Sequence, residues 1–143
     1  METTMSTRKD NISVSDVMIL TKDVPLVNEK EILKVALEKM SLTHLGIICV
    51  TDAANVLLGI CTDGDIRRKL LKIQKPFSAL LGDDVLDHSI RTPITIGPDA
   101  SLSDAVKLMG SKKIWDIPVV SDDGVLVGLL HLHPAVEALM ASE

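Results

Sequence analysis

The chain has 143 residues, 46% of them hydrophobic, and a formal net charge of −5. This length suits one compact domain or two small ones that share a core. The negative charge argues against nucleic-acid binding, which needs a basic face, and no apolar run is long enough to span a membrane. The core must be aliphatic, because the sequence contains one Trp, one Phe and no Tyr.

The start of the sequence lacks the apolar stretch of a signal peptide. The two cysteines, Cys49 and Cys61, fall inside predicted buried strands and have no metal-ligand spacing. Reduced core thiols of this kind fit a cytoplasmic protein. We therefore predict a cytoplasmic location, no metal and no cofactor.

The first predicted elements follow a polar start. Residues 1–13 lack periodicity, so we expect a disordered segment. Residues 14–18 begin the first structural unit, and residues 24–27 form a short extended segment. Asn28 and Glu31 then make a capping-box pattern before a helix. The apolar stripe of this helix consists of Ile32, Leu33, Ala36, Leu37 and Met40.

Two strands and a second helix complete the first half. Residues 46–51 form a continuous apolar run, typical of a strand buried on both faces, and residues 56–61 form the next strand. A helix is predicted over residues 66–72, and residues 75–81 connect the halves. The apolar side of that helix is expected to hold Ile66, Leu70 and Leu71.

The second half repeats this order. Ser101 with Asp104 is another capping-box pattern, and residues 121–124 are a strong hairpin turn. The other predicted elements are an extended segment at 93–96, strands at 116–120 and 125–130, and a helix at 134–140.

A repeat underlies this order. Gly59 and Gly128 start similar segments at an offset of 69. Residues 47–52 match residues 117–122 at an offset of 70, and residues 16–18 match 84–86 at an offset of 68. The chain is therefore one β-α-β-β-α unit written twice.

The repeat predicts a mixed α/β (α+β) fold. We divide the sequence into a first motif at residues 14–80 and a second at residues 81–143. A sheet of about three short strands is not stable alone, so we expect two pseudo-twofold-related motifs packed sheet to sheet. Clefts between them would be lined by strand ends and helix starts.

The turn from Thr62 to Asp65 is the main candidate site. A strand, a polar turn and a helix start leave backbone N–H groups pointing outward, where a phosphate fits. Thr62 can donate to a phosphate oxygen, and Asp65 can accept from a ribose hydroxyl pair. Arg68 shares the face of Asp65 and can reach a phosphate or carboxylate. The simpler interpretations are that Thr62 or Asp65 only caps the helix and that the basic run is a solvated face.

Metal binding is a weaker hypothesis. The carboxylates of Asp63 and Asp65, on either side of Gly64, form a pair of the kind that holds a magnesium ion, but no third ligand is evident nearby. His131 and His133 point the same way if they lie on a strand, either as a metal pair or as the polar lining of a cleft. The remaining histidines, His44 and His88, are expected at the surface.

Two motifs carry a family resemblance. One is the strand Ile117-Pro118-Val119-Val120-Ser121-Asp122, and the other is Gly59-Ile60-Cys61-Thr62-Asp63-Gly64-Asp65. On these residues the sequence resembles a pair of CBS domains, a Bateman module, over residues 14–140. The resemblance implies a regulatory module that binds an adenosine or cytidine nucleotide or a nucleotide-sugar. Its expected ligand contacts are Thr62, Asp63, Gly64, Asp65, Arg68, Ile117, Pro118, Val119, His131 and His133.

A narrower resemblance concerns residues 59–68 and 128–133. They are similar to the C-terminal CBS pair of bacterial arabinose-5-phosphate isomerases, in which a sugar-isomerase domain precedes the module and makes the precursor of Kdo. Nothing in this chain resembles that catalytic domain, and we find no catalytic constellation. The resemblance implies a regulatory portion of such an enzyme or a free-standing relative, with a sugar-isomerase domain as a partner in a parent protein.

The two halves are not expected to bind equally. The family carries an Asp at the position of Pro134, and His131 stands where the first half has Thr62, so we predict one tight ligand per chain. We also expect a homodimer, because residues 125–130 and 135–140 carry more apolar surface than a monomer covers. The alternative function is a structural dimerisation module without a ligand.

Overall fold

The computed structural model describes residues 11–142. These residues form two compact units, which divide the chain differently from the repeat. Unit 1 combines the described residues up to Asp23 with those from Ile94 onward, and unit 2 contains Val24–Pro93. The sequence division at residues 14–80 and 81–143 therefore does not coincide with the compact units, because the start of the first repeat packs with the second.

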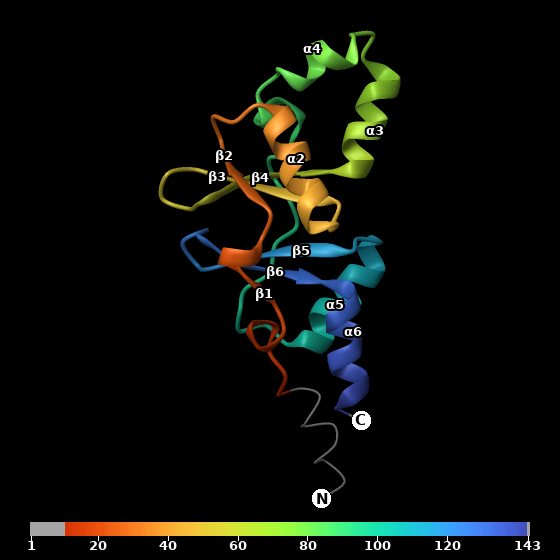
Figure 1. Ribbon diagram of the computed structural model, residues 1–143. Coiled ribbons are helices and arrows are strands. Elements are labelled where there is room, and N and C mark those ends of the chain that lie inside the picture. The colour runs from red at the N-terminus through yellow and green to blue at the C-terminus, as the bar shows by residue number, and fades with distance from the viewer. Residues whose placement is uncertain (1–10, 143) are drawn as a thin grey trace, which may run out of the picture. The chain divides into compact units, whose positions relative to one another are not determined.

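Unit 2 contains a three-stranded sheet in the order β2-β3-β4. Strand β3 pairs in parallel with β2 and antiparallel with β4. Two helices, α2 and α3, cover one face of the sheet (Figure 1). The elements are β2 (Leu26–Asn28), α2 (Leu33–Thr43), β3 (Ile47–Thr51), β4 (Leu57–Thr62), α3 (Asp63–Lys72), α4 (Phe77–Leu81) and the 3-10 helix η3 (Val85–His88). Every residue of β3 is buried, which confirms the prediction of a fully buried strand.

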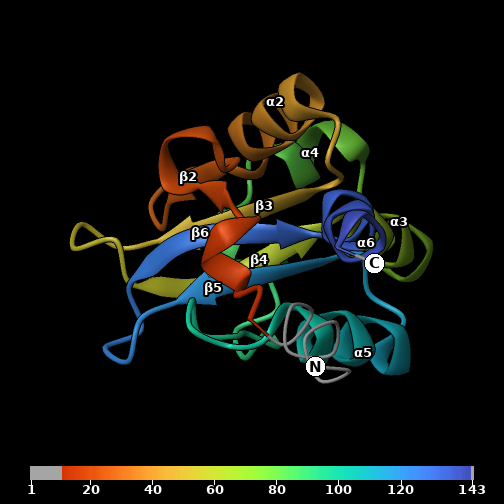
Figure 2. The ribbon, with the colours of Figure 1, turned by 90° about the horizontal axis from the view of Figure 1, so that it is seen from below.

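Unit 1 contains a three-stranded sheet in the order β1-β6-β5, antiparallel throughout. Helices α5 and α6 lie side by side and cover one face of this sheet (Figure 2). The elements are the 3-10 helix η1 (Val14–Asp16), β1 (Ile19–Leu20), the 3-10 helix η2 (Thr21–Asp23), α5 (Leu102–Lys112), β5 (Asp116–Val120), β6 (Leu126–His131) and α6 (Leu132–Ala141). The two sheets with their helices confirm the predicted mixed α+β fold.

The described start of the chain is tied to unit 1. The N–H of Leu102 donates to the carbonyl of Ile12 at 2.8 Å, and Ser13 forms a β-bridge with Ser101. Residues 1–10 of the segment that we expected to be disordered lie outside the described residues. Within residues 11–142, no helix is both long enough and apolar enough to cross a membrane.

Equivalent residues of the two repeats lie 69 positions apart in the sequence, both in the helices and in the β-hairpins. Val50 lies opposite Gly59 and Val119 opposite Gly128, and a register shift follows both pairs. The predicted offset of 70 for the strand motifs is therefore wrong by one position. The predicted offset of 68 near the start of each repeat is also wrong. Ile19 lies opposite Leu129, whereas Ile90 bridges Ile60, so these segments repeat at an offset of 71.

The starts of two helices differ in how well they were predicted. Helix α2 has Ile32 at its N-cap without a side-chain hydrogen bond, so the Asn28–Glu31 capping box is wrong. Asn28 ends β2, and its Oδ1 accepts from the N–H of Lys30 at 3.0 Å in a local turn. The N-cap of α5 is confirmed, because the Ser101 hydroxyl accepts from the N–H of Asp104 at 3.4 Å.

Helix α3 begins at Asp63, earlier than predicted, because Thr62 caps it. Ile66 is buried as expected, but Leu70 is 41% exposed and Leu71 is 83% exposed. The predicted apolar side of this helix is therefore wrong beyond its first turn. Neither leucine belongs to the hydrophobic core cluster of unit 2 that contains Ile66.

Two glycines allow a chain segment to run directly against a strand. A Cβ atom on Gly59 would lie 2.8 Å from the Ile90 carbonyl oxygen, and one on Gly128 would lie 2.7 Å from the Ile19 carbonyl oxygen. Any side chain at these positions would overlap with backbone, which moves less readily than a flexible side chain. The lack of a side chain at Gly128 therefore allows β1 to lie directly against β6, and the lack of one at Gly59 allows Ile90 to lie directly against β4.

We predict that Gly128→Ala lowers the free energy of unfolding by about 3 kcal/mol, because the new methyl group overpacks the contact between β1 and β6. Urea unfolding followed by circular dichroism measures this. The matched control is Gly110→Ala within α5, where a Cβ meets no atom within 4 Å. Its expected effect is a gain of about 0.5–1 kcal/mol. Equal stability of the two variants would contradict the packing argument.

We predict that the folded protein reacts very slowly with thiol reagents. Burial, together with the negative charge of Asp65, raises the pKa of Cys61 to about 12, and Cys49 is also fully buried. The thiolate is the reactive species, so at pH 8 about one Cys61 thiol in ten thousand is ionised. Ellman titration should detect two thiols only after unfolding.

The same shift has a consequence for stability. Because the folded pKa of Cys61 lies above the unfolded value, the unfolded chain loses the thiol proton first, and stability should fall as the pH rises above 9. Rapid stoichiometric labelling of the folded chain would refute the prediction that the thiols are protected.

Candidate functional site

Thr62 and Asp65 hold each other at the start of α3. The Thr62 hydroxyl accepts from the backbone N–H of Asp65 at 3.2 Å and donates to the Asp65 carboxylate at 2.8 Å. The first of these bonds is a helix N-cap. The capping role that the sequence suggested for Thr62 is therefore confirmed. The hydroxyl proton of Thr62 is directed to Asp65, whereas the sequence suggested a phosphate oxygen as its acceptor.

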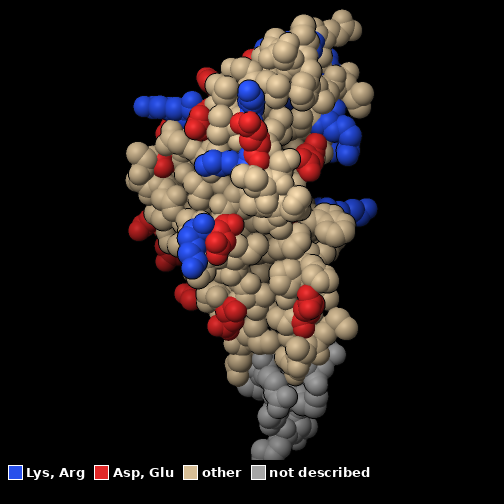
Figure 3. Space-filling view, in the orientation of Figure 1, with Lys and Arg blue, Asp and Glu red and all other residues tan. Residues whose placement is uncertain are grey.

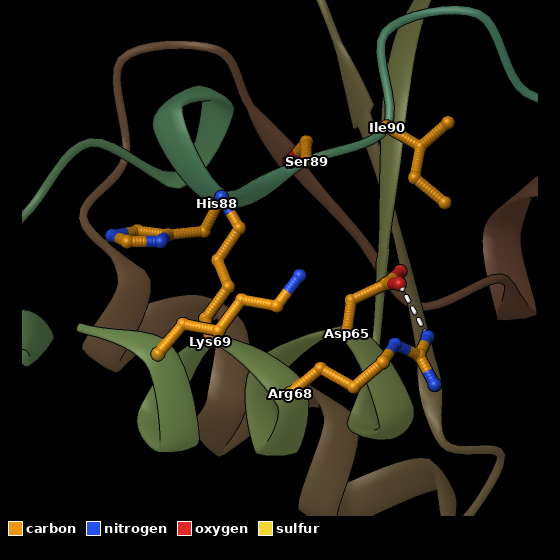
Figure 4. A pocket seen from close by; sticks show the side chains of 7 residues that line it. Asp65, Arg68, Lys69, His88, Ser89 and Ile90 are labelled. Carbon is orange, nitrogen blue, oxygen red and sulfur yellow. Dashed lines mark hydrogen bonds and ion pairs between the residues drawn. The ribbon is translucent and has the colours of Figure 1, made fainter.

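The carboxylate of Asp65 is oriented by two donors. Besides Thr62, the guanidinium of Arg68 donates to Oδ1 of Asp65 at 2.7 Å (Figure 4). The Asp65 side chain is 16% exposed and that of Arg68 is 59% exposed. A carboxylate has about four acceptor positions, so two remain for the hydroxyl groups of a ligand. The pair is thus a fixed hydrogen-bond acceptor beside a cation that has further N–H donors.

The backbone N–H groups at the α3 start are partly used within the protein. Asp63 donates its N–H to the Gly46 carbonyl at 3.1 Å, and Asp65 donates its N–H to Thr62. Fewer backbone N–H groups are therefore free to bind a phosphate at this turn than the sequence suggested. The side chain of Asp63 is exposed, and a cavity beside it is lined by Leu37, Met40, Ser41, His44, Gly46 and Asp63.

A second cavity adjoins Asp65 and Arg68. It has a volume of about 230 Å³ and lies within unit 2, between α3, η3 and the segment that follows η3. Besides His88, its lining residues are Asp65, Arg68, Lys69, Lys72, Ser89 and Ile90. The amino group of Lys69 donates to the Asp87 carbonyl at 2.8 Å. This bond joins α3 to η3 at the edge of the cavity.

His88 is buried, with 4% of its surface exposed, so the prediction of a surface residue is wrong. Its Nε2 bonds to the Asp83 carboxylate at 2.8 Å, and Lys75 donates to the same carboxylate at 2.7 Å. These bonds hold the pKa of Asp83 below its usual value. No local signal predicts this contact, because the spacing from Asp83 to His88 matches no capping pattern. The imidazole points away from Asp65 (Figure 4).

The equivalent turn of unit 1 has different chemistry. Nδ1 of His131 bonds to the Asp116 carboxylate at 2.8 Å. Burial raises the pKa of Asp116, although the bond to His131 opposes this shift. His133 lies in α6, where it pairs with Glu137 at 2.7 Å. The prediction that His131 and His133 share one strand face is therefore wrong, because the strand ends at His131.

Three predicted contacts belong to the core of the sheet in unit 1. Ile117, Pro118 and Val119 are buried in β5, and the first and third pack against α5 and α6. Among residues 11–142, no group of three or more histidine, cysteine or carboxylate side chains has the arrangement of a metal site. On the face drawn in Figure 3, basic and acidic side chains are interspersed.

Comparison with protein families and relatives identifies the repeat. The profile of the CBS domain matches residues 14–72 and 84–133. The arabinose 5-phosphate isomerase KdsD of Salmonella typhi is 32% identical over 136 residues, which cover 92% of this chain and 38% of the relative. Protein RP505 of Rickettsia prowazekii is 30% identical over 120 residues, which cover 84% of this chain and 35% of the relative. The chain thus spans less than two fifths of the length of these relatives.

Solved structures show the same fold. The crystal structure of CBSX2 in complex with AMP superposes with a TM-score of 0.79 at 27% identity, covering 90% of this chain and 96% of that chain. A CBS domain-containing protein from Bacillus anthracis superposes with a TM-score of 0.84 at 21% identity, covering 95% and 98%. The two profile matches and the superpositions agree with the internal repeat, and the chain therefore belongs to the CBS domain family, of which it carries a tandem pair.

Proposed function

We propose that the chain is a regulatory module that binds one nucleotide or nucleotide-sugar at the start of α3. The observation that carries the proposal is the oriented carboxylate of Asp65. Held by Thr62 at 2.8 Å and Arg68 at 2.7 Å, it presents fixed acceptors to the hydroxyl pair of a ribose. Fixing the carboxylate before binding lowers the entropic cost of ligand capture.

The ligand class is supported by a relative. CBSX2, 27% identical to this chain, has been solved in complex with AMP. A ribose on Asp65 would place a charged group of the ligand within reach of the Arg68 guanidinium, which bonds well to phosphate or carboxylate. Binding would shift the populations of two conformations and so act on a linked enzyme or a second copy.

The proposal also covers the enzyme domain on which the module acts and its cellular location. Similarity to KdsD covers 38% of that enzyme, so we propose that the module regulates a sugar-isomerase domain. We further propose that the protein is cytoplasmic, which keeps both buried thiols reduced. The sequence shows no catalytic constellation, and we propose that the module acts by binding.

We predict that the chain binds one AMP and that Asp65→Ala weakens this binding about ten- to a hundredfold. The loss corresponds to about 1.5–3 kcal/mol for a hydrogen bond to a charged acceptor. Titration calorimetry measures both the affinity and the number of sites. A thermal-shift series with AMP, ADP, ATP and CMP ranks the ligands, because any ligand of the folded state raises the melting temperature.

The matched control is Asp123→Ala, which removes one exposed carboxylate from the hairpin turn of unit 1 and should leave the affinity unchanged. Asp65→Asn keeps the shape of the side chain but removes its negative charge. Its affinity for AMP therefore separates the effect of the charge from that of the Thr62–Asp65 contact at the helix start. Two equally tight AMP sites, or unchanged affinity in Asp65→Ala, would show that the site assignment is wrong. No thermal shift with any nucleotide would favour the ligand-free alternative.

Exposed apolar side chains support homodimerisation as a second role. The expected surface over residues 125–130 is largely covered, since Leu126, Leu129 and Leu130 are buried. Four of the seven large exposed apolar residues of unit 2 lie close together in sequence at the end of α3 and the start of α4: Leu70, Leu71, Ile73 and Phe77. Apolar groups gathered in this way are typical of protein–protein contacts. We propose that a second copy of the chain covers them.

We predict that the chain is a dimer in solution and that Leu71→Lys shifts it toward the monomer. Leu71 is 83% exposed, so the new charge costs little in the folded monomer but is poorly tolerated in an apolar interface. Multi-angle light scattering at several concentrations measures the mass. Leu42→Lys, at a residue that is 81% exposed in α2, is the control. A wild-type monomer at high concentration would exclude the dimer.

A further inference from the structure

The cavity between α3 and η3 is small. Its volume of about 230 Å³ lies below the roughly 300–1,000 Å³ typical of pockets for drug-sized ligands. It therefore suits one compact polar group of a ligand better than a complete nucleotide. In Figure 4, Asp65 and Arg68 lie together at one side, and Lys69 extends toward η3 on the other.

Two of the three basic side chains that line this cavity, Lys69 and Lys72, have no carboxylate partner among residues 11–142. Arg68 is paired with Asp65. Lys69 donates to a neutral backbone carbonyl, so its charge remains uncompensated. The side-chain amino group of Lys72 makes no hydrogen bond or ion pair with residues 11–142. Two unbalanced lysines beside one cavity are unexpected in a chain with a net charge of −5, and they create a local potential that attracts anions.

The equivalent helix of the second repeat shows whether the fold needs these basic side chains. Helix α6 repeats α3 at an offset of 69 and has the same length. The residues of α6 that match Asp65, Arg68, Lys69 and Lys72 are Pro134, Glu137, Ala138 and Ala141. The same backbone thus forms without any of these basic side chains. The fold of this helix therefore does not require these basic side chains.

We propose that this cavity is an anion subsite for the phosphate group of a small sugar phosphate whose hydroxyl pair bonds to Asp65. The proposal rests on the proposed role of Asp65 as the hydroxyl acceptor. Lys69 and Lys72 supply point charges for the phosphate. Arg68 uses one of its five N–H donors on Asp65, so it can bond to the phosphate while it still orients the carboxylate.

D-Ribose 5-phosphate tests the proposal, with inorganic phosphate and D-ribose as separate arms. Titration calorimetry at low salt should show at least tenfold weaker binding of ribose 5-phosphate to the Lys69→Ala/Lys72→Ala variant. These alanines are the residues that unit 1 has at the matching positions, so the variant is expected to fold. Inorganic phosphate should bind more weakly and depend on the same lysines. Binding should also weaken as salt rises.

The control variant is Lys34→Ala/Arg67→Ala, which removes the same charge from exposed positions outside the cavity lining. It should change the affinity less than twofold. If losing the Lys69 bond to Asp87 lowers the melting temperature, Lys72→Ala alone provides the test. An equal loss in the control pair, or none in either pair, would overturn the proposal.

A parallel measurement of AMP binding distinguishes failure of this proposal from failure of the proposed function. If AMP binding requires Asp65 but ribose 5-phosphate binding ignores both lysines, the anion subsite is wrong and the nucleotide site stands. If ribose 5-phosphate binding requires the lysines and Asp65 while AMP does not bind, the subsite stands and the nucleotide assignment fails.

Discussion

The close approach of backbone to backbone at two glycines is the constraint on which both units depend. Gly59 and Gly128 lie in the strands β4 and β6, and each faces a carbonyl oxygen that leaves no room for a Cβ atom. One contact brings β1 to the edge of a sheet formed by the second repeat. The other brings Ile90 against β4, next to α3. The residues that follow η3 thereby become a wall of the cavity at Asp65.

The two repeats share their backbone and differ in their chemistry. His44 and Lys113 both end a helix with a left-handed conformation. At the helix start, however, Thr62 bonds to Asp65 in one repeat, whereas His131 bonds to Asp116 in the other. Backbone geometry alone therefore does not determine what each turn can bind. The carboxylate that suits a hydroxyl pair is present only in the first repeat, because Pro134 occupies the matching position in the second.

Helix capping and ligand binding are compatible at Asp65. The cap uses the backbone N–H of Asp65 and one acceptor position of Thr62. The carboxylate uses one acceptor position for the Thr62 hydroxyl and one for Arg68. Its other positions remain for a ligand. The same contacts that stabilise the first turn of α3 also fix the direction of the carboxylate.

The sequence by itself determined the repeat, the fold class, the family and the turn at Thr62–Asp65. These follow from local patterns: apolar runs, turn residues and a motif of fixed spacing. Only the tertiary structure decided that the start of the first repeat packs with the second, that the strand motifs share the offset of the helices, and that His88 is buried beside Asp83. It also decided that Lys69 and Lys72 share a cavity with Asp65. The physical reason is that each of these facts depends on contacts between segments distant in sequence, which local spacing does not encode.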